Sequence, residues 1–200
     1  MTWVVLIEYL NSLKKLKMEF KTTNINGLIL IKPKKFKDNR GFFLESFQKS
    51  NYEKIVGKHV FVQDNFSKSK KNVIRGLHYQ LKNSQDKLIY VTQGALMNVV
   101  VDLRKSSPTF LCKFKIKLSD NNNLQLFIPK GCANGILSLS EELSLNYKCT
   151  DYYNPSSALG IRWNDPTINI NWGIEKPILS SQDKKLPFYK DLLINNLLPR

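Results

Sequence analysis

The chain has 200 residues, 42% of them hydrophobic, which suffices for one domain with a packed core and excludes wholesale disorder or a collagen-like chain. Its 31 basic residues against 16 acidic ones give a net charge of +15, which favours an anionic partner such as a phosphorylated metabolite, a nucleic acid or an acidic membrane. Most of the basic residues are lysines in scattered doublets, however, and a solvated surface explains the excess more simply than a nucleic-acid site.

Residues 1–17 contain a short apolar run that is followed by basic residues. A secretory signal has the opposite order, and the run is far too short to span a membrane. We expect residues 1–17 to be an N-terminal extension, with Met18 as an alternative start, and residues 18–200 to form a single domain. Because no other stretch reaches transmembrane length, we expect a cytoplasmic protein without a membrane partner.

From Leu28 onward the pattern predicts an all-β fold. Short runs rich in β-branched and aromatic residues alternate with turn signals at 93–94, 119–123 and 129–131, which favours an antiparallel sandwich or barrel. Helices are expected only at 48–56 and in the tail after Ser180. The predicted strands are 28–31, 58–63, 87–92, 96–103, 112–118 and 124–128, and in 112–118 lysines at 113, 115 and 117 alternate with apolar residues, which predicts one solvent-exposed face.

Cysteines and histidines are scarce. Cys112, Cys132 and Cys149 lie far apart and form no Cys-x-x-Cys pair, which disfavours a zinc ribbon or a disulfide framework and favours a reducing compartment. His59 and His78 are too few for a His-rich metal site, so we expect no metal ion.

Polar residues gather in the stretches Gln63-Asp64-Asn65 and Arg75-Gly76-Leu77-His78-Tyr79-Gln80, followed by Lys87. On a regular strand, Arg75 and Leu77 would share one face, and Gly76 and His78 the other. A glycine here indicates close approach by a ligand or by backbone. From spacing alone, a hydrogen-bonded core histidine and a surface arginine are an equally good interpretation.

In order and spacing, these stretches resemble the dTDP-4-dehydrorhamnose 3,5-epimerase family. Each motif alone is weak, but the whole series, which spans about residues 24–190, is specific. The other motifs are Asp38-x-Arg40-Gly41-x-Phe43-x-Glu45, Lys87-Leu88, Val101-Asp102-Leu103-Arg104, Ser107-Pro108-Thr109, Ile128-Pro129-Lys130-Gly131, Tyr147-Lys148, Tyr152-Tyr153, Trp163-Asn164-Asp165-Pro166 and Leu179-Ser180-x-x-Asp183.

The resemblance implies a cupin-type jelly-roll β-barrel with a few short helices, dimeric through exchanged N-terminal strands. It implies an epimerase that inverts C3, C5 or both in a nucleotide-linked 4-keto-6-deoxy sugar, for capsule or lipopolysaccharide synthesis. The C4 ketone acidifies the protons at C3 and C5, so the reaction needs a base on one face and an acid on the other. It requires no redox cofactor, and the sequence contains no GxGxxG fingerprint.

The resemblance also assigns site residues. His78 would be the base, Asp183 would orient it, Lys87 would stabilise the enolate oxygen, and Tyr147 would be the acid. A packed core aromatic is the alternative for Tyr147 and for Tyr153, which matches a tyrosine that stacks on the nucleotide base. His59 matches no family position, and we expect it in a surface loop. The residues that match positions holding the nucleotide diphosphate and base are Arg40, Glu45, Gln63, Asn65 and Arg75.

Three positions that face the substrate in the family depart from its pattern. Asn134 stands in place of a histidine, Ala158 of a glutamate and Gln182 of a lysine. Because the base and acid remain, we expect catalysis, with Asn134 among the substrate contacts. The substitutions leave open the nucleotide (dTDP or GDP) and the sugar (hexose or heptose), and a GDP-linked 4-keto-6-deoxyheptose is the expectation that they suggest.

Other functions remain as alternatives. A sugar-nucleotide 3,4-ketoisomerase on the same barrel would also use a base, but Tyr147 and the 75–78 motif favour the epimerase. A catalytically dead cupin that binds a sugar nucleotide or a nucleic acid is disfavoured by the two intact catalytic groups and by the lack of clustered arginines between aromatics. A metal-dependent cupin dioxygenase is the least favoured alternative, because two histidines are too few for its metal site.

Overall fold

The computed structural model describes residues 18–200, so the expectation for residues 1–17 lies outside the described residues. Its strands are β1 (Met18–Thr22), β2 (Ile29–Pro33), β3 (Lys35–Asp38), β4 (Gly41–Leu44), β5 (Gln63–Lys70), β6 (Ile74–Gln80), β7 (Lys87–Gln93), β8 (Ala95–Asp102), β9 (Lys113–Ser119), β10 (Gln125–Ile128), β11 (Cys132–Ser138), β12 (Glu142–Cys149) and β13 (Ala158–Gly160). The helices are α2 (Lys49–Val56), the 3-10 helix η1 (Asp183–Lys185) and α3 (Tyr189–Ile194).

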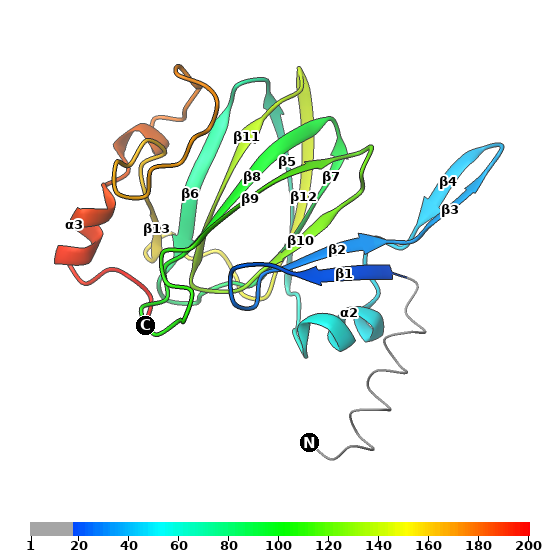
Figure 1. Cartoon of the computed structure of the whole chain (residues 1–200), viewed down its shortest axis with the longest axis horizontal. Coiled ribbons are helices and arrows are strands. Elements are labelled where there is room, and N and C mark those ends of the chain that lie inside the picture. The colour runs from blue at the N-terminus through cyan, green and yellow to red at the C-terminus, as the bar shows by residue number, and fades with distance from the viewer. Residues whose placement is uncertain (1–17) are drawn as a thin grey trace, which may run out of the picture.

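Two antiparallel sheets face each other in the body of the molecule (Figure 1). One has the strand order β1-β2-β10-β7-β12-β5, and the other has the order β13-β6-β11-β8-β9. Between them lies an apolar core that includes Ile89 and Leu145 from the first sheet and Val100 and Leu118 from the second. The predicted all-β class with a cupin-like, jelly-roll sheet arrangement is confirmed.

The outer faces of both sheets are also covered. Leu77 and Val101 on the second sheet pack against Trp172, Tyr189 and other residues of the C-terminal segment. On the first sheet, α2 packs through its buried side chains against β2, β7 and β10. The predicted helix at 48–56 and the predicted helical tail are therefore confirmed. Within residues 18–200, no helix is long and apolar enough to cross a membrane.

The lysine alternation of β9 gives a half-exposed strand, as the sequence predicts. The Nζ atoms of Lys113 and Lys115 donate to the carbonyls of Ile168 and Asn171, at 2.8 and 2.6 Å. The strand predicted at 58–63 is wrong, because pairing with β12 begins only at Gln63, opposite Cys149. Before it, Phe61 packs edge-on against Phe47 with ring centroids 5.3 Å apart, whereas Val60 and Val62 stay exposed.

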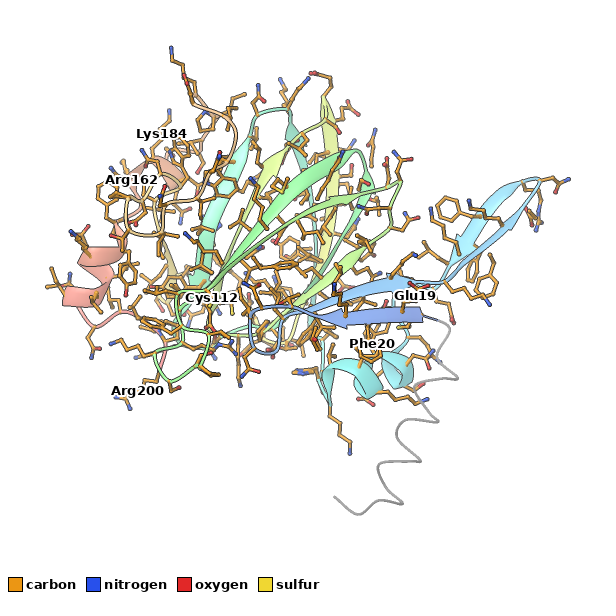
Figure 2. The ribbon with its side chains drawn as sticks, in the orientation of Figure 1. Glu19, Phe20, Cys112, Arg162, Lys184 and Arg200 are labelled. Carbon is orange, nitrogen blue, oxygen red and sulfur yellow. The ribbon has the colours of Figure 1, made fainter. Side chains whose placement is uncertain are left out.

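The hairpin of β3 and β4 extends away from the body, on the side opposite the C-terminal segment (Figure 1). In Figure 2, Glu19 and Phe20 mark β1 near the base of this hairpin, whereas Arg162 and Lys184 mark the far side. The aromatic side chains of Phe42 and Phe43 are 54% and 65% exposed. The hairpin therefore presents apolar surface that residues 18–200 leave uncovered.

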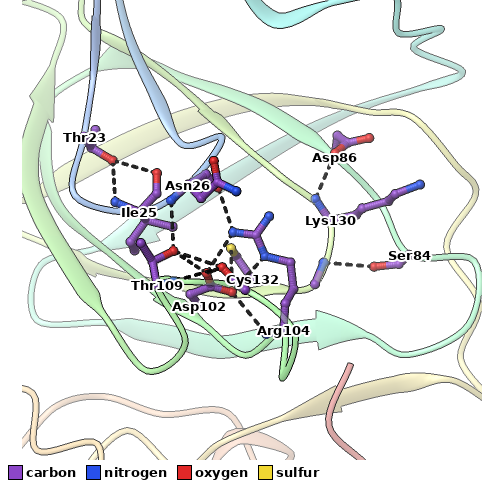
Figure 3. Close-up of polar contacts among 12 residues, drawn as sticks. Thr23, Ile25, Asn26, Ser84, Asp86, Asp102, Arg104, Thr109, Lys130 and Cys132 are labelled. Atoms are coloured by element: carbon purple, nitrogen blue, oxygen red, sulfur yellow. Dashed lines mark hydrogen bonds and ion pairs between the residues drawn. The ribbon is translucent and has the colours of Figure 1, made fainter. Parts of the chain in front are cut away.

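A buried carboxylate holds the loop before β2 against the body (Figure 3). Asp102 accepts hydrogen bonds from the guanidinium of Arg104 and from the hydroxyls of Ser107 and Thr109, at 2.6–2.8 Å. Arg104 and Thr109 in turn bond the backbone of Asn26. Burial opposes ionisation of Asp102, but these donors outweigh it and lower the pKa of the carboxyl to about 2.

Candidate active site

A continuous depression opens between the two sheets at one end. It consists of two adjoining cavities of about 380 and 470 Å³, which share His78, Lys87, Tyr147, Tyr153 and Gln182 as lining residues. β6 of the second sheet supplies the histidine, and β7 and β12 of the first sheet supply the lysine and Tyr147. Titratable groups from both sheets thus face one space.

His78 and Asp183 form a close pair at this depression. Nε2 of His78 lies 2.6 Å from Oδ1 of Asp183, and the Ser180 hydroxyl donates to Oδ2 at 2.9 Å. Burial would raise the pKa of Asp183, but the hydrogen bond and charge of His78, the Ser180 hydroxyl and the Gly76 N–H lower it below its usual value. In the tautomer in which this carboxylate accepts from Nε2–H, Nδ1 carries the lone pair that a base needs. This Nδ1 makes no hydrogen bond to the described residues.

Arg75 and His78 both line the second cavity, so the prediction that they lie on opposite faces of a strand is wrong. His78 pairs with Asn134 of β11, but Arg75 pairs with Ile136, so two residues of β6 oppose one residue of β11. Such a β-bulge shifts the alternation of side chains by one position. Gly76 is needed at this bulge, because a Cβ atom there would lie 2.6 Å from the backbone oxygen of Asn134.

Tyr147 on β12 is half-buried and lines both cavities. Burial raises its pKa, with a further contribution from Cys149, while the positive charge of Arg75 acts in the opposite direction. A raised pKa keeps the phenol protonated at neutral pH, so that it is able to donate a proton.

Lys87 at the start of β7 forms no ion pair with any of the residues 18–200. Burial lowers the pKa of its ammonium group, and the neighbouring Cys149 partly opposes this. A half-buried cation that faces a cavity is suited to a ligand oxygen that carries or develops negative charge.

Gln63, Asn65 and Tyr153 meet at the rim of the first cavity. Gln63 Nε2 donates to Asn65 Oδ1 at 2.9 Å, and Gln63 Oε1 accepts from the backbone N–H of Tyr153 at 3.0 Å. Tyr153 is 56% exposed, so its ring can stack on a ligand. In the second cavity, the Arg75 guanidinium is held by Ser69 Oγ and the carbonyl of Lys68, each at 2.9 Å.

The structure does not bring Arg40 and Glu45 into this depression. Arg40 lies at the tip of the β3–β4 hairpin, where its guanidinium bonds Asp38 at 2.7 Å. Glu45 follows β4, at the base of the hairpin. Neither residue lines either cavity of its own chain.

All three positions that depart from the family pattern line the depression: Asn134 the second cavity, Ala158 the first and Gln182 both. Ser180 also lines it, and its role was not predicted. The signal was present in the Leu179-Ser180-x-x-Asp183 spacing, because a serine three residues before an aspartate commonly bonds it. Here the Ser180 hydroxyl also accepts from the Asp183 backbone N–H at 3.0 Å.

His59 is in a loop, as expected, and its side chain is 24% exposed, so it is partly covered instead of fully at the surface. Its Nδ1 lies 3.3 Å from Oδ2 of Asp86 and its Nε2 lies 2.8 Å from the carbonyl of Val56. Its ring packs on Phe127 with centroids 5.0 Å apart. The partial burial has a simple cause, since His59 and Phe61 pack against the first sheet near Phe127 of β10. Within residues 18–200, no group of three or more His, Cys, Asp or Glu side chains could hold a metal ion.

Comparison with known proteins identifies the family. A family model for dTDP-4-dehydrorhamnose 3,5-epimerase matches residues 22–191. The Salmonella typhimurium enzyme of that name is 46% identical over 175 residues, which cover 86% of this chain and 96% of the relative. The Escherichia coli enzyme is 47% identical, with 86% and 94% covered.

Solved structures agree. An epimerase from Legionella pneumophila in complex with dTDP-4-keto-L-rhamnose has a TM-score of 0.87 and 44% identity, and covers 92% of this chain and 98% of its own. A 3'-monoepimerase from Streptomyces bikiniensis in complex with dTDP-quinovose has a TM-score of 0.83 and 29% identity, with 88% and 91% covered. The chain therefore belongs to the dTDP-4-dehydrorhamnose 3,5-epimerase family of isomerases.

Proposed function

We propose that the protein epimerises a dTDP-linked 4-keto-6-deoxyhexose at C3 and C5. The observation that carries this proposal is the pairing of two proton-transfer groups from opposite sheets. A carboxylate-bound imidazole, His78, and a protonated phenol, Tyr147, line one cavity. A base and an acid that approach a ring from two sides can remove a proton from one face and return one to the other.

In the proposed mechanism, Nδ1 of His78 takes the proton from the carbon next to the C4 ketone. The electrons of the C–H bond move to the ketone oxygen, and the resulting enolate lies beside the ammonium of Lys87. Tyr147 then donates its phenolic proton to the opposite face of the carbon as the ketone re-forms. One proton is removed and one is supplied, so the sugar changes configuration without a net change in composition. Exchange with solvent restores His78 and Tyr147.

The nucleotide end would bind at the rim. The planar Arg75 guanidinium is suited to a pyrophosphate, since its fork bonds two oxygens. Gln63 and Asn65 supply amides for the base, and the exposed Tyr153 ring supplies a stacking surface. The net charge of +15 would also favour a dianionic substrate.

We further propose that residues 18–200 form a single domain that acts as a cytoplasmic homodimer in polysaccharide synthesis, with exchanged N-terminal strands. The exposed Phe42 and Phe43 of the β3–β4 hairpin support this, because they would be covered by a second copy. Arg40 at the tip, and Glu45, would then serve the depression of the partner subunit instead of their own.

The test is to incubate the purified protein with dTDP-4-keto-6-deoxyglucose and to identify the product by NMR. Inversion at C3 and C5 with the ketone still at C4 supports the proposal. A ketone that has moved to C3 would indicate a ketoisomerase, and an unchanged sugar would indicate a binding protein.

A GDP-linked 4-keto-6-deoxyheptose is a second candidate substrate. It is favoured by Ala158, whose small side chain in the cavity wall leaves room for a larger base or sugar, and by the neutral Gln182 beside it. The ratio of kcat/KM for the two substrates decides. A clear preference for the dTDP-hexose removes the second candidate, and a preference for the GDP-heptose replaces the first.

A further inference from the structure

Two asparagines form an amide pair between the sheets, at the wall of the second cavity. Asn134 on β11 is partly exposed to the cavity, whereas Asn98 on β8 is fully buried. Asn98 lies on the same strand face as Leu96 and Val100, which belong to the apolar core. A polar side chain in such a place needs an explanation.

The surroundings fix the orientation of the Asn134 amide. Its Nδ2 donates to the carbonyl of Val99 at 3.1 Å and to Oδ1 of Asn98 at 3.0 Å. A backbone carbonyl can only accept, so the nitrogen of Asn134, not its oxygen, must face Val99. Both amide hydrogens of Asn134 are then used. Its Oδ1 makes no hydrogen bond to the described residues, so Asn134 offers the cavity an acceptor and no donor.

Asn98 holds the Asn134 amide in place, but one of its own polar atoms is left without a hydrogen bond to the described residues. Its Oδ1 accepts from Asn134, and its Nδ2 is buried without a hydrogen-bond partner among residues 18–200. A buried amide nitrogen without a partner is unfavourable, and an apolar side chain of similar size would avoid it. What the site gains from Asn98 is a second acceptor for Nδ2 of Asn134, which holds the amide in one orientation.

The acceptor lies next to the proposed base. Asn134 and His78 are register partners on adjacent strands, so their side chains are close neighbours on one face. Under the proposed function, on which this step rests, His78 removes a proton from C3 or C5. C3 carries a hydroxyl group that can donate a hydrogen bond, whereas C5 carries the ring oxygen and a methyl group, which cannot.

We infer that Asn134 is a specificity residue whose Oδ1 accepts a hydrogen bond from the C3 hydroxyl of the sugar, and that Asn98 is the positioning residue that fixes this oxygen. The Asn98–Asn134 pair favours the binding mode in which C3 of the sugar lies next to His78. A histidine at position 134 could offer the substrate an N–H donor. The Asn98–Asn134 pair offers an acceptor instead, so it selects a substrate group that can donate a hydrogen bond.

The test compares two substrates, the 4-keto-6-deoxy sugar nucleotide and its 3-deoxy analogue, with the enzyme and its Asn98→Leu and Asn134→Ala variants. Loss of one hydrogen bond to substrate is expected to lower kcat/KM for the hydroxylated substrate about 10- to 100-fold more than for the 3-deoxy analogue. In D2O, the ratio of deuterium wash-in at C3 to that at C5 should fall in both variants. Asn98→Asp, whose carboxylate still accepts from Nδ2 of Asn134, should keep the preference for the hydroxylated substrate.

A purely structural role for the pair would lower kcat/KM equally for both substrates and leave the C3-to-C5 ratio unchanged, and that result overturns the inference. If Asn98→Leu fails to fold, the same two ratios in Asn134→Ala decide. The proposed function fails separately, when the unaltered enzyme incorporates no deuterium at C3 or at C5.

Discussion

Replacing Asp183 with asparagine tests how His78 is supported as a base. The Asp183 side chain is 5% exposed, and its Oδ1 lies 2.6 Å from Nε2 of His78. After His78 takes a proton, it is a cation beside this carboxylate. Two opposite charges about 4 Å apart interact by about 4 kcal/mol at an effective dielectric constant of ~20, which equals almost 10³-fold in rate. Because 42% of the His78 side chain is exposed, solvent screens part of this interaction.

We therefore expect kcat of Asp183→Asn to fall by about 10²-fold, with little change in KM, because Asp183 stabilises the protonated base and does not hold the nucleotide. Kinetic assays of epimerisation measure both constants. Glu141→Gln is the matched control, since it removes the same charge from a carboxylate that is 82% exposed and pairs with Lys71 outside the cavity. A kcat for Asp183→Asn within about twofold of the unaltered enzyme would refute the proposed role.

Three further predictions concern the acid, the buried carboxylate and the hairpin. Tyr147→Phe should retain deuterium wash-in at C3 while delivery of a proton at C5 is lost, as NMR in D2O will show; normal inversion at both carbons would exclude Tyr147 as the acid. Asp102→Asn should lower the free energy of unfolding at pH 7 by about 2.5 kcal/mol, the equivalent of lowering the pKa from 3.8 to about 2. The stabilisation by Asp102 is present above pH ~4 and is lost as the pH falls towards 2, so urea unfolding of the variant should depend less on pH in this range. Phe43→Ser should shift the protein towards the monomer in light scattering, and an unchanged dimer or a monomeric unaltered protein would each count against strand exchange.

Sequence reasoning succeeded where one local signal decides the structure. The lysine alternation at 113–117 has a period of two and gives β9, and the glycine at 94 gives the turn between β7 and β8. The motif series also identified Asp183 as the partner of His78, although 105 residues separate them. That pairing came from the family resemblance, because no periodicity links residues so far apart.

The errors have physical causes that a single sequence does not carry. The run at 58–63 has strand propensity, but Phe61 packs against the first sheet and the two valines stay exposed outside a strand. The polar segment 63–70 pairs at the sheet edge instead. The bulge in β6 places Arg75 and His78 together, because the partner strand sets the register. Asn98 gave no signal at all, since its importance lies in a contact with Asn134 across two strands.

The central claim is that His78 removes the sugar protons, and deuterium wash-in measures this directly. The unaltered enzyme and His78→Asn are incubated in D2O with dTDP-4-keto-6-deoxyglucose, and exchange at C3 and C5 is followed by NMR, with nucleotide affinity measured by calorimetry as the folding control. We predict exchange at both carbons in the unaltered enzyme and a loss of about 10²- to 10⁴-fold at both in the variant, with nucleotide affinity nearly unchanged. Full exchange in His78→Asn would contradict the account.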